Sequence, residues 1–268
     1  MKILAVITLI TCVLTIAAHV NCSDSLGPID DGTTTIGIYA DSGAAWACVT
    51  AARHMFLWMG YTVEFIYAST VNTEDLRHID IFYFPGGSAG PYIKDITPQG
   101  KEKLRQLIRN GAGYIGTCAG AMFAADTQVW QGHTYATDQL AIFPGTAQGP
   151  INEIFPYPQI GMCQVNLNKT HPIAQGHPDS VWIMLYHGPF MTPNSGATIE
   201  TVGTYDITGQ PALVACEYGD GRIFLTGPHP EWEEDSDRDS VSYFENYDDT
   251  GSDWPLMHSA ARWCLHED

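Results

Sequence analysis

Short apolar runs alternate with longer amphipathic stretches over the first half of the chain. The runs have the length of buried strands, and they cover residues 35–39, 62–66, 79–84 and 113–117. Two stretches between them, residues 44–59 and 98–110, predict helices. In the second stretch, Leu104, Leu107 and Ile108 recur at helical spacing, and Gly111 follows as a stop signal. This alternation predicts βαβ units and a mainly parallel sheet covered on both faces.

The second half of the chain has a different pattern, with short apolar runs and little helix between them. Gly219-Asp220-Gly221 predicts a tight hairpin turn, and residues 256–264 predict a closing helix. The expected strands cover residues 159–166, 180–185, 197–202, 212–218 and 222–226. The pattern therefore predicts an α/β fold: a flavodoxin-like doubly wound, mainly parallel sheet with a β-rich C-terminal half. No repeat or linker divides it, so residues 23–268 are expected to form one domain.

The first 22 residues have the pattern of a signal peptide. Lys2 precedes an apolar run over residues 3–18, and a polar stretch begins at Asn21. Small residues between them predict cleavage near residues 18–23. We therefore expect a secreted or lumenal protein, extracellular or endolysosomal. The alternative is an uncleaved anchor helix, although the apolar run falls just short of a membrane span.

Charge argues against two classes of partner. The chain has 12 basic and 30 acidic residues, and removal of the leader, which contains Lys2 and no acid, leaves a net charge of −19. Nucleic-acid binding needs a basic surface, and anionic membranes repel an acidic protein. We therefore expect neither nucleic acid nor, after leader removal, a membrane as partner.

Cysteine usage fits a secreted chain with one reactive thiol. Of the seven cysteines, Cys12 and Cys22 leave with the leader, so five remain. An odd number indicates one thiol kept free, and the other four could form two disulfides in any of three pairings. Those four are Cys48, Cys163, Cys216 and Cys264. Asn168-Lys169-Thr170 is a glycosylation sequon. No motif indicates a metal site, and no cofactor is expected.

The strongest chemical motif is Gly116-Thr117-Cys118-Ala119-Gly120-Ala121, which follows a predicted strand. Small residues around a nucleophile permit a sharp strand-to-helix turn that exposes its side chain. A helix N-terminus beneath the sulfur also favours negative charge there. Cys118 is thus the expected nucleophile; the alternative is a buried structural cysteine or a disulfide partner.

Two further motifs are expected at the same sheet edge, where ligands of open parallel sheets bind. Gly86 and Gly87 end the third strand, and their N–H groups could form an oxyanion hole with that of Ala119. His229 and Glu231 follow the last strand and project to the same side in extended backbone. They are the expected base and its orienting carboxylate. The alternatives are a plain glycine turn and a surface turn.

These motifs together resemble the class I glutamine amidotransferase-like superfamily, and within it the family named after the N-terminal domain of fungal biotin–protein ligase. The resemblance spans residues 35 to 232 and rests on four blocks in order: residues 84–92, 113–121, 142–150 and 227–231. It implies Cys118 as nucleophile, His229 and Glu231 as its partners, and an oxyanion hole near Gly87. Glutaminase domains usually carry Gln four residues after the nucleophile, where this chain has Met122.

The expected function is therefore hydrolysis of an amide in a small molecule or peptide through a Cys-His-Glu triad, with a γ-glutamyl amide as one possibility. Gamma-glutamyl hydrolase exemplifies a secreted member with this triad type. The residues expected to bind substrate are Ser88, Met122, Tyr186 and His187. The alternative is a non-catalytic secreted binding or structural protein that retains the scaffold.

An acidic segment follows the expected triad. Residues 231–253 contain ten acidic residues and a single basic one, Arg238. Such a run predicts a solvated loop. Its position suggests a rim around the site that repels anions and attracts cations.

Overall fold

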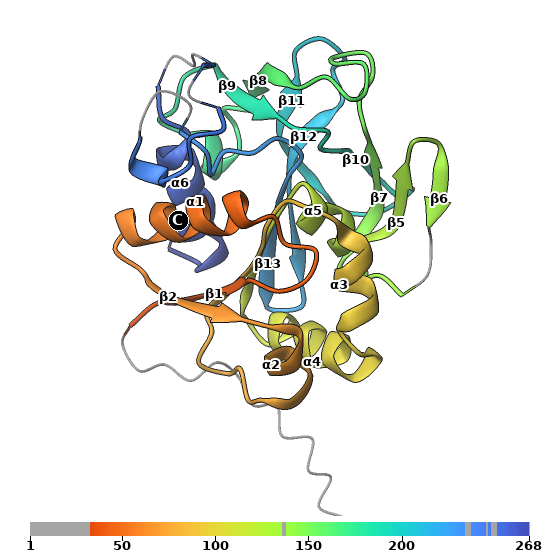
Figure 1. Cartoon of the computed structure of the whole chain (residues 1–268), viewed down its shortest axis with the longest axis vertical. Coiled ribbons are helices and arrows are strands. Elements are labelled where there is room, and N and C mark those ends of the chain that lie inside the picture. Colours follow the sequence, from red (N-terminus) through yellow and green to blue (C-terminus); the bar gives the residue numbers. More distant parts are fainter. Residues whose placement is uncertain (1–32, 136–137, 234–236, 245, 248–250, 268) are drawn as a thin grey trace, which may run out of the picture.

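A nine-stranded mixed sheet lies at the centre of the structure (Figure 1). The computed structural model describes residues 33–135, 138–233, 237–244, 246–247 and 251–267. The strand order is β2-β1-β3-β4-β13-β12-β11-β8-β9. The first five strands are mutually parallel: β2 (Thr62–Ile66), β1 (Thr35–Tyr39), β3 (Ile81–Phe84), β4 (Gly113–Thr117) and β13 (Gly221–Thr226). The other four are antiparallel: β12 (Pro211–Tyr218), β11 (Glu200–Tyr205), β8 (Gly161–Leu167) and β9 (Ser180–Leu185).

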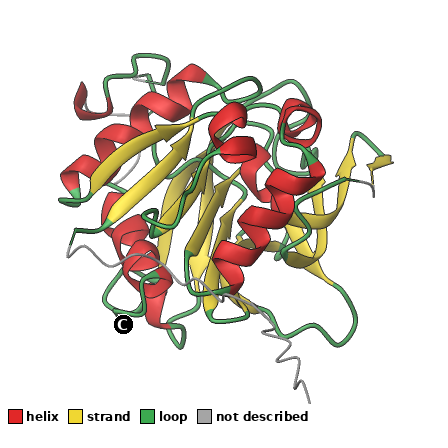
Figure 2. Cartoon of the chain, turned by 90° about the horizontal axis from the view of Figure 1, so that it is seen from below, coloured by secondary structure: helices red, strands yellow, loops and turns green. Residues whose placement is uncertain are grey.

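Helices cover both faces of this sheet (Figure 2). Along β3, Phe82 and Phe84 point into one apolar core, while Ile81 and Tyr83 point into the other, because successive side chains of a strand alternate. The first core includes side chains of α2 (Ala68–Thr73), α3 (Ala89–Asp95), α4 (Pro98–Arg109) and α5 (Ala119–Ala124). The second includes side chains of α1 (Trp46–Trp58) and α6 (Trp254–Cys264). This is the doubly wound arrangement expected from the sequence.

The helix α4 shows how local signals set an element's bounds. The Thr97 hydroxyl accepts a hydrogen bond from the Gly100 N–H, and Pro98 occupies the first turn, where a missing N–H costs nothing. After the helix, Gly111 adopts a positive φ of 114°. That conformation ends helices and is open to glycine without strain.

A second, four-stranded sheet was not expected from the sequence. It consists of β10 (Phe190–Pro193), β7 (Phe143–Gly149), β5 (Ala125–Trp130) and β6 (His133–Tyr135). Strand β5 begins directly after α5, so this sheet continues from the helix that carries Cys118 at its start. Two 3-10 turns complete the structure: η1 (Pro172–Ala174) and η2 (Asp237–Asp239).

The expected disulfides are absent. All five cysteines of the described part of the chain are buried thiols: Cys48, Cys118, Cys163, Cys216 and Cys264. Cys216 lies in the core on one face of the main sheet, whereas Cys163 and Cys264 lie in the core on the other. The prediction of two bridges was wrong: all four expected partners are free thiols, the main sheet lies between Cys216 and the other core pair, and Cys163 Sγ contacts the Ile183 carbonyl instead, at 3.3 Å.

The expected leader, residues 1–22, lies outside the described residues. Within the described ranges, no helix is both long enough and apolar enough to span a membrane.

Candidate active site

Cys118 occupies a sharp turn between β4 and α5. Its backbone has φ 51° and ψ −102°, a region that residues with a side chain rarely adopt. The Cys118 N–H donates to the Thr226 carbonyl of β13 at 2.8 Å, which fixes the turn to the neighbouring strand. Gly120 lets the turn close, because a Cβ there would lie 1.9 Å from the Phe84 backbone oxygen. The sharp strand-to-helix turn expected from the sequence is therefore present. This turn, the elbow, holds the Cys118 sulfur beyond the end of β4.

His229 is held in one orientation by three contacts. Its backbone N–H donates a hydrogen bond to the Met184 carbonyl at 2.8 Å. Its ring stacks on Trp232, with centroids 4.1 Å apart and planes 8° from parallel. Its Nδ1 lies 2.9 Å from Oε1 of the fully buried Glu231. A carboxylate accepts hydrogen bonds only, so Nδ1 carries the proton and Nε2 is left as the basic nitrogen.

The second ring nitrogen is available for Cys118. Nε2 of His229 is buried and has no hydrogen-bond partner among the described residues. The Cys118 thiol is close enough to His229 to interact with it electrostatically. Its sulfur also lies 3.9 Å from the Tyr186 carbonyl oxygen. Catalytic hydrogen bonds are often long in ligand-free enzymes and shorten when substrate binds.

The environment of His229 strengthens it as a base. Burial lowers the pKa of His229, but the Glu231 carboxylate raises it. The net pKa lies well above the usual range for histidine. A charged imidazolium beside Cys118 would stabilise negative charge on the sulfur.

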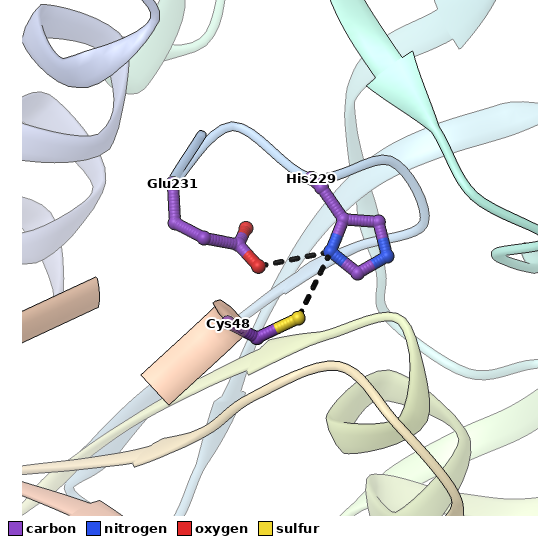
Figure 3. Close-up of side chains that lie close together, drawn as sticks. All are labelled: Cys48, His229 and Glu231. Carbon is purple, nitrogen blue, oxygen red and sulfur yellow. Dashed lines mark hydrogen bonds and ion pairs between the residues drawn. The ribbon is translucent and has the colours of Figure 1, made fainter. Parts of the chain in front are cut away.

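Cys48 is the unexpected neighbour of this pair. Its Sγ lies 3.7 Å from His229 Nδ1, on the nitrogen that Glu231 also contacts (Figure 3). Burial raises the pKa of Cys48 to about 12, so it is a neutral thiol at physiological pH. The Cys48 sulfur, a His229 nitrogen and a Glu231 oxygen lie within 4.8 Å of one another, a donor set that could hold a soft metal ion. In the structure, Glu231 instead forms a hydrogen bond directly to His229 Nδ1, and this bond orients the imidazole.

A cavity of about 770 Å³ opens in front of Cys118. Gly87 and Ala119 line it, as the oxyanion-hole prediction requires. The Gly87 N–H donates no hydrogen bond to another described residue, although both neighbours are bonded: Gly86 O accepts from Ala45 N, and Ser88 N donates to Gly43 O. The Ala119 N–H begins α5, so it has no partner within that helix. Two amide donors are thus available beside the sulfur.

Gly86 has a different position from the one expected. It is not among the residues that line the cavity. A Cβ at Gly86 would lie 2.3 Å from His229 Cε1 and 3.0 Å from the Cys48 sulfur. Because Gly86 has no side chain, the His229 ring can lie against the end of β3.

The four residues expected to bind substrate all line the cavity: Ser88, Met122, Tyr186 and His187. His187 has a positive φ of 60° and a ring that lies 4.7 Å from those of both Tyr157 and Tyr186. Its Nε2 is buried without a hydrogen-bond partner in the described chain. Asn168 lies elsewhere, exposed after β8, where its amide donates to the Thr201 carbonyl at 2.9 Å.

Four described acids of the acidic segment are not solvated. Glu231, Glu233, Asp239 and Asp253 are all buried. Glu233 pairs with Arg238, whose guanidinium lies 4.2 Å from the Trp254 ring centroid. The prediction of a solvated run was wrong for these four acids, because specific partners fix them against the fold. The segment also supplies Tyr243 and Phe244 to the cavity, so it does border the site.

Replacing Glu231 with Gln should lower the pKa of His229, because the carboxylate that stabilises the imidazolium is removed while a hydrogen-bond acceptor remains. The raised pKa of His229 contributes stability that is fully present below the unfolded-state pKa of about 6.5 and is lost as pH rises through the folded-state value. The variant should therefore lose less unfolding free energy over that interval than the wild type. NMR titration of the ring and denaturant unfolding across pH measure both effects; equal titration in the two proteins would contradict the assignment.

Comparison with known families identifies the chain. Residues 34–253 match the model of the family described as "Biotin-protein ligase, N terminal". The chain belongs to this family. It is 25% identical over 214 residues to a biotin–protein ligase of Schizosaccharomyces pombe, covering 73% of this chain and 33% of the ligase. It is 27% identical over 162 residues to an uncharacterized protein of Chlamydia muridarum, covering 57% of this chain and 60% of that protein. The chain thus matches only a third of the ligase and less than two thirds of the other relative.

Solved structures share the fold. A glutamine amidotransferase of Thermotoga maritima has a TM-score of 0.53 at 13% identity, covering 87% of this chain and 98% of that one. A putative GMP synthase protein of Thermoplasma acidophilum has a TM-score of 0.51 at 13% identity, covering 89% of this chain and all of that one. The family model confirms the resemblance to the biotin–protein ligase N-terminal family, and these structures confirm the expected glutamine amidotransferase-like fold.

Proposed function

We propose that the protein hydrolyses an amide through Cys118, His229 and Glu231. The observation that carries this proposal is the strained backbone of Cys118 beside a histidine whose Nε2 is buried without a partner among the described residues. Strain of this kind costs of order 1–3 kcal/mol and is found mostly at functional sites. A purely structural cysteine would need neither the elbow nor an oriented, carboxylate-paired histidine.

The reaction follows from these positions. His229 Nε2 takes the Cys118 proton, and the sulfur forms a bond to the amide carbonyl carbon. The N–H groups of Gly87 and Ala119 stabilise the oxyanion. The imidazolium returns its proton to the nitrogen as the C–N bond breaks, and the amine leaves. Water, deprotonated by His229, then attacks the thioester, and the released acid regenerates the Cys118 thiol. Glu231 stabilises the imidazolium in both halves.

Trapping the acyl-enzyme tests this proposal. The intact protein is mixed with a panel of activated amides, such as acyl-4-nitroanilides, and analysed by mass spectrometry after acid quench. We expect an added acyl group on Cys118 that hydroxylamine removes, and no adduct on Cys118→Ala. Acyl transfer that persists in Cys118→Ala would refute the proposed role.

A second candidate is a non-catalytic binding protein that retains the scaffold. Met122 favours it, because this apolar side chain lines the cavity where glutaminases use Gln to hold their substrate. A substrate other than glutamine accounts for Met122 equally well. Failure of the whole panel to acylate Cys118, with tight binding of an unmodified ligand, would favour the second candidate.

We also propose that the protein is secreted or lumenal, on the basis of the leader pattern in residues 1–22. Expression in eukaryotic cells should yield a mature N-terminus near residues 18–23, and Asn168 should carry a glycan. N-terminal sequencing and a glycosidase mass shift measure this. An intact, cell-retained N-terminus would contradict it.

A further inference from the structure

The cavity in front of Cys118 is walled mainly by aromatic side chains. They come from α1, from β5 and from the loops after β9 and β13, so the fold brings them together from distant parts of the sequence. They are Trp46, Trp130, Tyr186, Trp232, Tyr243 and Phe244. Met122 and Ile160 add aliphatic surface. An apolar ligand binds favourably to such a wall, because binding removes apolar surface from water.

Part of this wall is held rigidly in the ligand-free protein. The Trp232 ring lies between two partners, His229 at 4.1 Å and Phe244 at 4.2 Å between centroids. Tyr186 meets Trp232 edge-on at 6.2 Å. Because these rings already support one another, ligand binding need not order them, and more of the contact energy appears as affinity.

The imidazoles of His187 and His229 are the side chains of the described cavity wall that can carry positive charge. Among the described residues on its wall there is no Asp, Glu, Lys or Arg. Two described acids of the segment after β13 are engaged, Glu231 with His229 and Glu233 with Arg238. A γ-glutamyl group carries an α-carboxylate and an α-ammonium, and burying either without a partner is costly. The cavity therefore suits the γ-glutamyl end poorly.

We propose that this cavity selects amides with a neutral, bulky apolar group, such as an aromatic ring, next to the scissile bond. The proposal rests on the hydrolase function proposed above and narrows its substrate class. At about 770 Å³ the cavity has the size of a typical small-molecule site. The net charge of −18 disfavours anions further.

Four electrophiles of graded chemistry test the proposal: iodoacetamide, N-benzyl iodoacetamide, and the benzyl compound with a para carboxylate or a para trimethylammonium group. Each alkylation rate of Cys118 in the native protein is divided by that of N-acetylcysteine. We expect the neutral benzyl compound to exceed iodoacetamide by about ten-fold or more, and both charged analogues to be about ten-fold slower than it. Equal rates, or a charged analogue as the fastest, would overturn the proposal.

A matched pair of variants locates the effect. Trp46 lines the cavity mouth and is 68% exposed, so Trp46→Ala should leave the fold intact. Trp182 is 40% exposed on β9 and does not line the cavity. The benzyl preference should fall about three-fold or more in Trp46→Ala and stay unchanged in Trp182→Ala. A preference lost equally in both, or in neither, would contradict the assigned wall.

Binding without chemistry separates this inference from the hydrolase proposal. Cys118→Ser should bind the neutral fluorophore N-phenyl-1-naphthylamine with an increase in fluorescence that N-benzylacetamide reverses. If no electrophile modifies Cys118 but the fluorophore binds, the hydrolase proposal fails and the apolar selectivity stands. If the electrophiles react but the fluorophore does not bind, the selectivity fails alone.

Discussion

Gly86→Ala should slow alkylation of Cys118 by about 100-fold while the protein remains folded. The new Cβ would lie 2.3 Å from His229 Cε1 and 3.1 Å from Nδ1. The ring cannot yield without losing either its bond to Glu231 or its stacking on Trp232. Displacing a catalytic group by about 1 Å can cost a factor of about 100. The second-order rate constant with iodoacetamide, measured with peptide mapping, checks this result.

Gly90→Ala is the matched control for this substitution. Gly90 lies in α3, where the nearest atom to an added Cβ is the Ser88 hydroxyl at 3.8 Å. Alanine in a helix is favoured over glycine, so the control should be at least as stable as the wild type and equally reactive. If Gly86→Ala retains wild-type reactivity, the placement of His229 against Gly86 is not needed for the thiol's function.

Gly120→Ala should destabilise the protein by about 3 kcal/mol or more, because overpacking against backbone cannot be relieved by a side-chain rotation. The added Cβ would lie 1.9 Å from the Phe84 carbonyl oxygen and 2.7 Å from its carbon. Both ends of this contact are fixed, since Tyr114 donates to the Gly120 carbonyl at 2.9 Å and Phe84 belongs to β3.

Thermal unfolding measures this effect. For a chain of this size, about 3 kcal/mol corresponds to a fall in Tm of roughly 6–12 °C. The same Gly90→Ala variant serves as control, with a Tm at or above that of the wild type. A Tm of Gly120→Ala within about a degree of the wild type would show that α5 can move away from β3 and that the elbow is less constrained than its backbone geometry indicates.

Local signals in the sequence were sufficient for the parallel half of the fold. The bounds of β1, β2 and β4 agree with the predicted runs. Strands β1 and β4 are buried along their whole length, and strands buried on both faces read as continuous apolar segments. Strand β2 is an edge strand with two exposed residues. The bounds of α4 were predicted to within one residue, because the residues that cap it are adjacent to it in sequence. The β-rich C-terminal half was also expected, although β11 begins three residues later than predicted.

The second sheet could not be predicted in the same way. Strand β7 contains Pro144 and Gly145 and alternates between buried and partly exposed positions. The other strands of this sheet, β5, β6 and β10, are short and contain several polar residues. Such strands gain their stability from pairing with one another rather than from their own composition, so a pattern-based prediction assigns them to loops.

Some residues of the candidate site could be predicted from the sequence and others could not. Cys118, His229 and Glu231 could be inferred because each follows a strand whose end faces the same edge of the sheet. Cys48 could not, since it lies 181 residues from the histidine it contacts and no motif surrounds it. The aromatic wall was missed for a similar reason: Trp46, Trp130 and Tyr243 are isolated in sequence and converge only in the fold.

Alkylation of the native protein with iodoacetamide, followed by mapping of the adduct, tests the central claim most directly. Cys118 should be modified first and alone. Cys48 also lines the cavity, but burial raises its pKa to about 12. The other three described cysteines, Cys163, Cys216 and Cys264, lie in the apolar cores and do not line the cavity. His229→Asn should slow that modification, since the base that takes the Cys118 proton is lost. An adduct on another cysteine with Cys118 unmodified, or a rate unchanged in His229→Asn, would contradict the account.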